Sequence, residues 1–581
     1  MKRIYLIPLF LFICTLSLLA ASEAEYNKLS KTYTLNSDGS QEFRYSMELT
    51  LFTHAAMNRT YGESFIIYNP AYQELKIHTS YTKQKDGTII STPENAFVEV
   101  LPRQAANAPA FNNLKEMVVV HTGLELGATI YLDYSIISKP GYLPTIDISE
   151  ANILASPVKD YTITIKTPEN KPLFYELSNS TVKPVFTTSG GVKEVTWKIS
   201  NMPAPSRDPL VTVLGGDIAL LTASGFASNN EALMYLNKQL TSAENAATKK
   251  LSEAITKNKK TDSERLYAIL DHVTDNVGMS LLSLKETGFR VRSIDEVTSS
   301  AFGTEAEKIN LLACLLNAAG IKAEVAASYF NNSDINSCGL SAIDELFVIA
   351  SVEGKQYLLT PKRKSMSEAG WYADYAKIVS ISNPGKVITI ETPSTELDYE
   401  YRITMGPAKA GIKAVASVGK SFFPYTSNYK TQYLSNDKEG REAKGDGFST
   451  FTYSTTQQYN NIDKYIVFML PDSPNSLSRS YYKNFNSKRS GNLLLPYKAK
   501  ESFRYIINLP DNMDLKTPAT SKIIDNSVGA STVSIKQIGK TVEVTRTLEI
   551  KKQLITPADY SAFRNIMIEW AGNNQLLFYA E

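Results

Sequence analysis

The stretch from Ala301 to Ala323, AFGTEAEKINLLACLLNAAGIKA, carries the strongest fold signal in this 581-residue chain. Its middle, LLACLLNAA, is apolar on nearly every side, which predicts a helix buried within a domain. Thr304 and Glu307 form a capping box at the start, and Gly320 is placed as the residue that ends the helix. We therefore expect a core helix over about Glu305–Ala319.

The pattern around this helix indicates an α+β domain over residues 221–394. Leucines recur at helical spacing over Asn230–Ile255, and a second helix is expected in SERLYAILDHVTDNV with Asp262 or Ser263 as its N-cap. Strand patterns follow the core helix. The expected strands are Glu324–Tyr329, Leu346–Val352 and Gln356–Leu359.

β-structure is expected on both sides of this domain. Residues 25–220 alternate apolar and polar residues between turn signals, which is typical of a β-sandwich region. Its clearest strands are Gln41–Leu51, Glu74–Tyr81, Thr129–Ile137, Asp160–Lys166 and Lys193–Ile199. Residues 395–581 return to the same pattern and predict a β-rich C-terminal domain with one short helix over Ala558–Trp570. No repeat of fixed period is visible.

This order resembles a family of exported bacterial proteins with an N-terminal β domain of unknown function (DUF3857-type), a transglutaminase-like core and a C-terminal β domain. The core helix is similar to the bacterial pattern G-D-C-x-D-x-A-x-L-L-x-x-L-L-x-A-x-G-I-x-A. The residues in register are Gly303, Leu311, Leu312, Leu315, Leu316, Ala318, Ala319, Gly320, Ile321 and Ala323. Near the C-terminus, Tyr505–Pro510 and Asp559-Tyr560 resemble the family's Y-x-x-x-L-P strand and closing D-Y. The resemblance implies a multidomain protein with a papain-like α+β core.

The same resemblance implies a catalytic triad that has been lost. In the family, a cysteine at the start of the core helix, a histidine on a following strand and an aspartate on the next strand carry the chemistry. Carried over one by one, these positions fall on Glu305, Phe347 and Thr360. None keeps the catalytic residue type, so we expect no catalytic residues of this kind. Glu305 also has a structural explanation, because an acid in the first turn complements the helix dipole.

Histidine positions support this expectation without any alignment. The four histidines are His54, His78, His121 and His272. Of the three cysteines, Cys14 lies in the expected signal peptide, so cleavage leaves Cys314 and Cys338. No histidine follows either of them, so a cysteine-then-histidine pair in the family's order is impossible in the cleaved chain. The two cysteines could form one disulfide bond in an oxidising compartment, although Cys314 should be a buried, inert thiol.

The first 24 residues, MKRIYLIPLFLFICTLSLLAASEA, have the pattern of a signal peptide: a basic start, an apolar run and small residues before the cleavage point. An uncleaved anchor is the alternative. We expect an exported protein, periplasmic or associated with the cell envelope, with no transmembrane segment after cleavage. The 61 basic and 59 acidic residues nearly balance, so charge gives no case for nucleic acid.

No cofactor or metal site is expected. The histidines and cysteines lack ligand spacing, and no phosphate loop, dinucleotide fingerprint or G-x-S-x-G elbow is present.

These observations favour a non-catalytic transglutaminase-like protein, a pseudoenzyme that binds or scaffolds a protein, peptide or glycan partner in a bacterial cell envelope. One alternative is a carboxylate-based hydrolase that uses the inherited cleft, which requires Glu305 to line an open pocket beside a second acid such as Glu307. The other is a carbohydrate-binding surface protein. For that function the tyrosine-rich segment Ser421–Tyr433 is the best candidate for an exposed aromatic patch.

Overall fold

The computed structural model describes residues 22–206, 208, 218–240, 246–330, 333–362, 376–389, 394–419, 434, 437, 439–444, 448–473, 476–477, 488–495, 498–572 and 574–581. Nearly all of the expected signal peptide and the whole segment Ser421–Tyr433 lie outside these ranges. Among the helices within them, none is long and apolar enough to cross a membrane.

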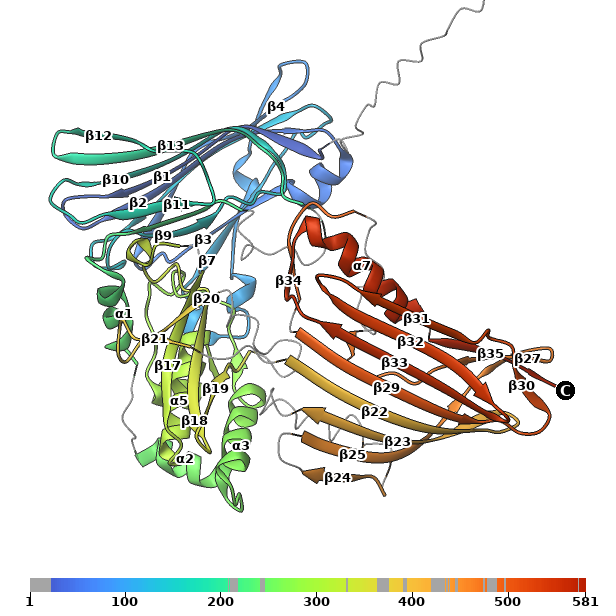
Figure 1. Cartoon of the computed structure of the whole chain (residues 1–581). Helices are drawn as coiled ribbons and strands as arrows, with labels where there is room; N and C mark the ends of the chain where they lie inside the picture. Colours follow the sequence, from blue (N-terminus) through green and yellow to red (C-terminus); the bar gives the residue numbers. More distant parts are fainter. Residues whose placement is uncertain are drawn as a thin grey trace, which may run out of the picture.

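The N-terminal region consists of three packed sheets (Figure 1). The largest has the strand order β12-β13-β10-β1-β2-β8-β4-β5. Its strands are β1 Ala24–Leu35, β2 Gln41–Leu51, β4 Gln73–Lys83, β5 Ile89–Ser91, β8 Thr129–Ser138, β10 Val158–Pro168, β12 Val185–Ser189 and β13 Val192–Met202. The smaller sheets are β3 Glu63–Tyr68, β7 Lys115–Val120 and β6 Phe97–Val100, and β11 Phe174–Ser178, β14 Leu220–Ser224 and β9 Asp147–Ala151. Side chains from all three sheets share one buried core, which confirms the predicted β-rich region.

The central region is the expected α+β domain. Its five-stranded antiparallel sheet has the order β19-β18-β17-β20-β21. The strands are β17 Ala323–Phe330, β18 Glu345–Val352, β19 Lys355–Leu359, β20 Ala376–Ser380 and β21 Val387–Ile388, and two short strands, β15 Gly278–Met279 and β16 Phe302–Gly303, pair separately. The helices are α1 Asn229–Asn237, α2 Ala246–Thr256, α3 Asp262–Asp275, α4 Ile294–Ser300 and α5 Glu305–Ala318. Helix α5 packs on β17 and β18 and against α2, α3 and α4, so it is enclosed on all sides.

Both ends of α5 are specified by local sequence. Thr304 is the N-cap, and its N–H donates to the Glu307 carboxylate over 2.8 Å. At the other end Gly320 has φ +80°, which lets the N–H of Ile321 donate to the Leu316 carbonyl over 2.9 Å. This is a Schellman ending. The predicted helix is confirmed and ends one residue earlier than expected.

Two details of the helical part differ from prediction. The N-cap of α3 is Thr261 rather than Asp262 or Ser263, because the Thr261 hydroxyl accepts the N–H of Glu264 over 3.1 Å. The leucine-rich span Asn230–Ile255 holds two helices, α1 and α2, rather than one.

The C-terminal region is β-rich, as predicted. Its main sheet has the order β24-β25-β23-β22-β29-β33-β32-β31. The strands are β22 Ser394–Met405, β23 Lys409–Gly419, β24 Arg441–Lys444, β25 Phe448–Gln458, β29 Lys498–Asn508, β31 Thr520–Asp525, β32 Gly529–Ile538 and β33 Thr541–Ile550. A four-stranded sheet combines β26 Asn460–Ile462, β27 Tyr465–Met469, β35 Gln575–Ala580 and β30 Met513–Leu515, and β28 Leu493–Leu494 pairs with β34 Leu554–Ile555. Helix α7, Pro557–Gly572, contacts β31, β32 and β33.

The two eight-stranded sheets share one topology over seven strands. In chain order β1, β2, β4, β8, β10, β12 and β13 occupy the same places as β22, β23, β24, β25, β29, β32 and β33. In both sheets the first strand pairs in parallel with a distant strand, β1 with β10 and β22 with β29, and the other shared pairs are antiparallel. The sequence shows no repeat that would have predicted this.

Candidate functional site

Glu305 begins helix α5, at the place where the sequence predicts a lost nucleophile. Its Oε2 lies 2.6 Å from Lys362 Nζ, and its Oε1 accepts the backbone N–H of Leu346 over 3.2 Å. The two charged side chains are 25% and 34% exposed. The carboxylate therefore pairs with a cation and is hydrogen-bonded to the start of β18.

Phe347 and Thr360 do not join Glu305. Alternate residues of β18 point to opposite faces of the sheet, and Leu346 and Val348 share the core that contains α5. Phe347 therefore points to the other face, as does Thr360, whose hydroxyl donates to Glu345 Oε1 over 3.3 Å. Phe347 and Thr360 are 1% and 2% exposed. Leu346, one residue earlier, points to the face of α5, and its N–H is the group that donates to Glu305.

Glu307, the second acid in the first turn of α5, forms a buried ion pair. Arg292 donates from Nε and Nη2 to its two carboxylate oxygens, each over 2.9 Å. The Glu307 side chain is fully buried, and the Arg292 guanidinium lies over the Phe302 ring at 4.4 Å. Each acid in this turn is thus engaged by a cation. The geometry that the carboxylate-based hydrolase needs, with Glu305 beside a second available acid, is not found among the described residues.

Lys308, one residue further along α5, is a buried lysine that the sequence analysis did not consider. Its ammonium donates to the Val277 carbonyl over 2.6 Å, and burial lowers its pKa to about 8. Its only sequence signal is a lysine that precedes an apolar run.

Two of the cysteines lie within the described residues. Within the described ranges, Cys314 and Cys338 are buried and form no disulfide bond. Cys314 lies inside α5, as predicted, and burial raises the pKa of Cys338 to about 12. His121, in the N-terminal region, is buried beside the Ser64 hydroxyl, and burial lowers its pKa to about 4.

Comparisons with known proteins support the domain order. The family model described as "Transglutaminase-like superfamily" matches residues 249–373, and two models for domains of unknown function with solved structures match residues 37–206 (DUF3857) and 463–578 (DUF3858). A crystal structure of a "putative protease" from Parabacteroides distasonis is 41% identical, covers 96% of this chain and 99% of its own, and has a TM-score of 0.80. The chain belongs to the transglutaminase-like superfamily.

Two further structures show much weaker similarity. A "putative cysteine protease" from Cytophaga hutchinsonii is 13% identical over 42% of this chain and 92% of its own, with a TM-score of 0.17. The periplasmic domain of TgpA from Pseudomonas aeruginosa is 12% identical over 53% and 90%, with a TM-score of 0.16. No curated protein matches the chain.

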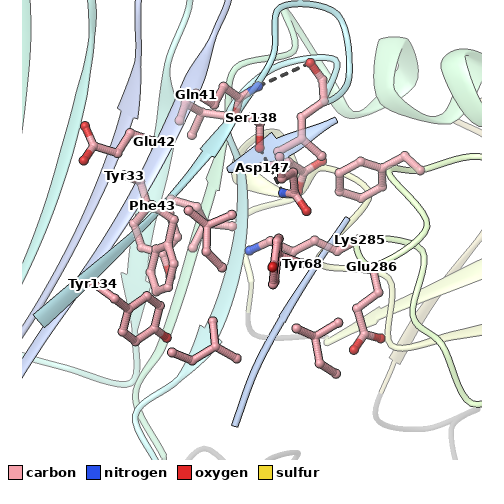
Figure 2. Close-up of a pocket in the computed structure, with 18 of the residues that line it drawn as sticks. Tyr33, Gln41, Glu42, Phe43, Tyr68, Tyr134, Ser138, Asp147, Lys285 and Glu286 are labelled. Atoms are coloured by element: carbon pink, nitrogen blue, oxygen red, sulfur yellow. Dashed lines mark hydrogen bonds between the residues drawn. The ribbon is translucent and has the colours of Figure 1, made fainter. Parts of the chain in front are cut away.

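The DUF3857 region and the transglutaminase-like core together line a cavity of about 280 Å³ that is partly open to solvent (Figure 2). Most of its wall comes from the sheets of the DUF3857 region, and aromatic side chains of β1, β2 and β8 form one side. The core contributes the loop between β15 and α4 through Lys285, Glu286 and Phe289. Apart from those three, the lining residues are Tyr33, Gln41, Glu42, Phe43, Phe65, Ile66, Ile67, Tyr68, Gln73, Leu114, Tyr134, Ile136, Ser138, Leu143, Thr145, Ile146, Asp147 and Ile148.

The cavity is partly open to solvent, and polar side chains form part of its wall, so water can fill it when no ligand is bound.

Lys285 is the cationic side chain of this wall. Its ammonium lies 5.5 Å from the centre of the Tyr33 ring and is directed toward the side lined by Tyr33, Phe43 and Tyr134 (Figure 2). The Lys285 side chain is exposed in the cavity, the surrounding protein atoms lower its pKa by removing part of its hydration, and nearby carboxylates, Glu150 first, act in the opposite direction. Among the described residues the ammonium makes no hydrogen bond and no ion pair.

The acids near Lys285 are satisfied by other donors. Asp147 accepts the N–H groups of Leu340 and Ser341 over 2.6 and 2.9 Å, which joins the core to the DUF3857 region. Burial nevertheless raises the Asp147 pKa to about 6. Glu286 accepts the N–H and hydroxyl of Ser283 over 2.7 and 2.8 Å. Glu150 accepts from Lys31 and from the hydroxyls of Tyr33 and Tyr161. Sequence analysis missed this site because its walls come from segments far apart in the chain.

Proposed function

We propose that this transglutaminase-like chain is non-catalytic and acts as a binding or scaffolding protein in a bacterial cell envelope. The observation that carries the proposal is the Glu305–Lys362 ion pair at the start of α5. In the family pattern that the core helix resembles, this position holds a thiol, whose ionisation is favoured by the helix N-terminus. A carboxylate held by an ammonium supplies no thiolate nucleophile.

Other residues support the same conclusion. The two cysteines described are buried, and the high pKa of Cys338 keeps its thiol protonated at neutral pH. All four histidines precede both of them in the chain, and the β18 residues that share the core with α5 include Leu346 and Val348.

Proteolysis is the second candidate, because the 41% identical relative is described as a "putative protease". The two candidates are separated by assaying the purified chain for amide hydrolysis and transamidation on peptide libraries, with Glu305→Ala and Cys314→Ala in parallel. We expect no turnover in any of the three. Turnover by the wild-type chain that disappears in either variant would overturn the proposal.

The proposed location rests on the N-terminal sequence pattern. We propose export, with cleavage after Ala24, and a protein, peptide or glycan partner in the periplasm or envelope. N-terminal sequencing of the protein purified from its native cells tests the first part, since the expected first residue is Glu25. An intact N-terminus in a cytoplasmic fraction would contradict it.

A further inference from the structure

We propose that the cavity between the DUF3857 region and the transglutaminase-like core is a binding site for a small organic carboxylate with a compact apolar or aromatic body, and that Lys285 pairs with the carboxylate. The inference deepens the proposed function, because it assigns a ligand class to a protein proposed to act by binding.

The cavity has the composition of a ligand site. Small-molecule sites are concave and mostly apolar, with a few polar groups that fix orientation. Here, most lining side chains are aliphatic or aromatic. Tyr33, Phe43 and Tyr134 stand together on one side, with the Phe43 ring centre 4.9 Å from Tyr33 and 6.3 Å from Tyr134. This wall suits a flat or compact apolar group.

The polar groups of the wall select the charge of the ligand. The Lys285 side chain is exposed in the cavity, so its ammonium, with three donors, is accessible to a ligand. The lining carboxylates Glu42, Asp147 and Glu286, and the nearby Glu150, already accept hydrogen bonds from other groups. The neighbouring acceptors are therefore engaged, and a ligand that brings its own acceptor is favoured. A carboxylate does this best, because hydrogen bonds between two ionised groups are the strong ones.

The loop that carries Lys285 is held against the DUF3857 region. The Arg290 guanidinium lies over the rings of Tyr72 and Tyr142, 4.7 and 5.6 Å from their centres. Gly288 has φ +67°, and a Cβ there would lie 2.6 Å from the Tyr142 ring. The loop conformation thus depends on close approach to the DUF3857 region, so the backbone that carries Lys285 is positioned before any ligand arrives.

The test uses calorimetric titration of the full chain with 3-phenylpropionate and octanoate, each paired with its neutral amide. We expect the acids to bind and the amides to bind at least about tenfold more weakly, the range expected for loss of one charge-assisted hydrogen bond. Lys285→Met should weaken acid binding by a similar factor, and Lys285→Arg should retain most of it. Lys259→Met, a change of an exposed lysine in the turn before α3, should have no effect.

Three outcomes overturn the proposal: no binding of either acid, equal binding of acid and amide, or equal binding to the wild type and a folded Lys285→Met. The acid–amide comparison needs only the wild type, so it decides the question even if the variant does not fold. Each of these outcomes leaves the non-catalytic proposal standing, because that proposal fails only on turnover in the hydrolysis assay.

Discussion

Glu307→Ala provides a quantitative test of how helix α5 is held. In the wild type the Glu307 carboxylate accepts four hydrogen bonds, three from Arg292 and one from the Thr304 N–H, at 2.8–3.1 Å. Its side chain is fully buried, and that of Arg292 is 16% exposed. Removing one partner of such a pair leaves an uncompensated charge and costs about 3–5 kcal/mol.

Glu305→Ala is the matched control, two residues earlier in the same turn. The Glu305–Lys362 pair is 25% and 34% exposed, so its loss should cost about 0–1 kcal/mol. The two variants remove the same side chain from the same helix turn. They differ in burial and in the number of donors left without a partner.

The assay is thiol labelling of Cys314 under native conditions, followed by mass spectrometry of the peptide that contains it. Cys314 is 1% exposed within α5, so labelling requires this helix to open. When reclosing is faster than labelling, each 1.36 kcal/mol changes the rate tenfold. We expect Glu307→Ala to accelerate labelling by about 150-fold to 5,000-fold and Glu305→Ala by at most about fivefold. Similar acceleration in both, or less than about tenfold in Glu307→Ala, would refute the reasoning.

Three further predictions concern single residues. Glu305→Cys should give a thiol at the start of α5 beside Lys362 that reacts with iodoacetamide at neutral pH faster than Cys338, whose pKa is about 12; equal rates would contradict the placement. Burial raises the Glu501 pKa to about 7, against about 4.3 in the unfolded chain. Between about pH 4 and pH 7 the folded state therefore keeps a proton that the unfolded chain releases, so the free energy of unfolding falls as pH rises through this range. In urea unfolding measured across this pH range, Glu501→Gln should flatten the pH dependence of the free energy of unfolding. An unchanged dependence in the variant would show that another group causes it. In Gly339→Ala the new Cβ would lie 2.4 Å from the buried Asp147 carboxylate, which accepts the N–H groups of Leu340 and Ser341. Displacing the carboxylate should make these two amides exchange hydrogen faster. Gly411→Ala, whose Cβ would have nothing within 4 Å, should leave their exchange unchanged.

The parts of the fold that sequence predicted are those with local causes. Helix α5 was predicted because Thr304, Glu307 and Gly320 specify its ends within one stretch of chain. Strand β2 was predicted with its observed bounds, Gln41–Leu51, because apolar and polar residues alternate along it.

The remaining features depend on contacts that sequence spacing does not reveal. A shift of one residue along a strand exchanges the two faces of a sheet. A position near Phe347 was therefore not enough to show that Leu346 faces α5. The Lys362–Glu305 pair joins residues on different elements, and Lys285 reaches a cavity whose walls come from another domain. The three acidic or hydroxyl residues from Thr261 to Ser263 are all good N-caps, so composition alone did not choose among them.

The parallel pairing in the two outer sheets has a consequence for how the chain acquires its structure. Tyr26 pairs with Val158, and Ser394 with Lys498, so each sheet closes only when residues more than a hundred positions apart meet. Loop-closure entropy must be overcome before such contacts stabilise anything, and topologies of this kind fold slowly. During synthesis the first strand must wait for most of its domain to emerge. We therefore expect the first strand hairpins, β1–β2 and β22–β23, to form early and to remain incomplete sheets with an unpaired edge. Until β10 and β29 are synthesised and pair with them, these hairpins are the segments most dependent on protection from aggregation.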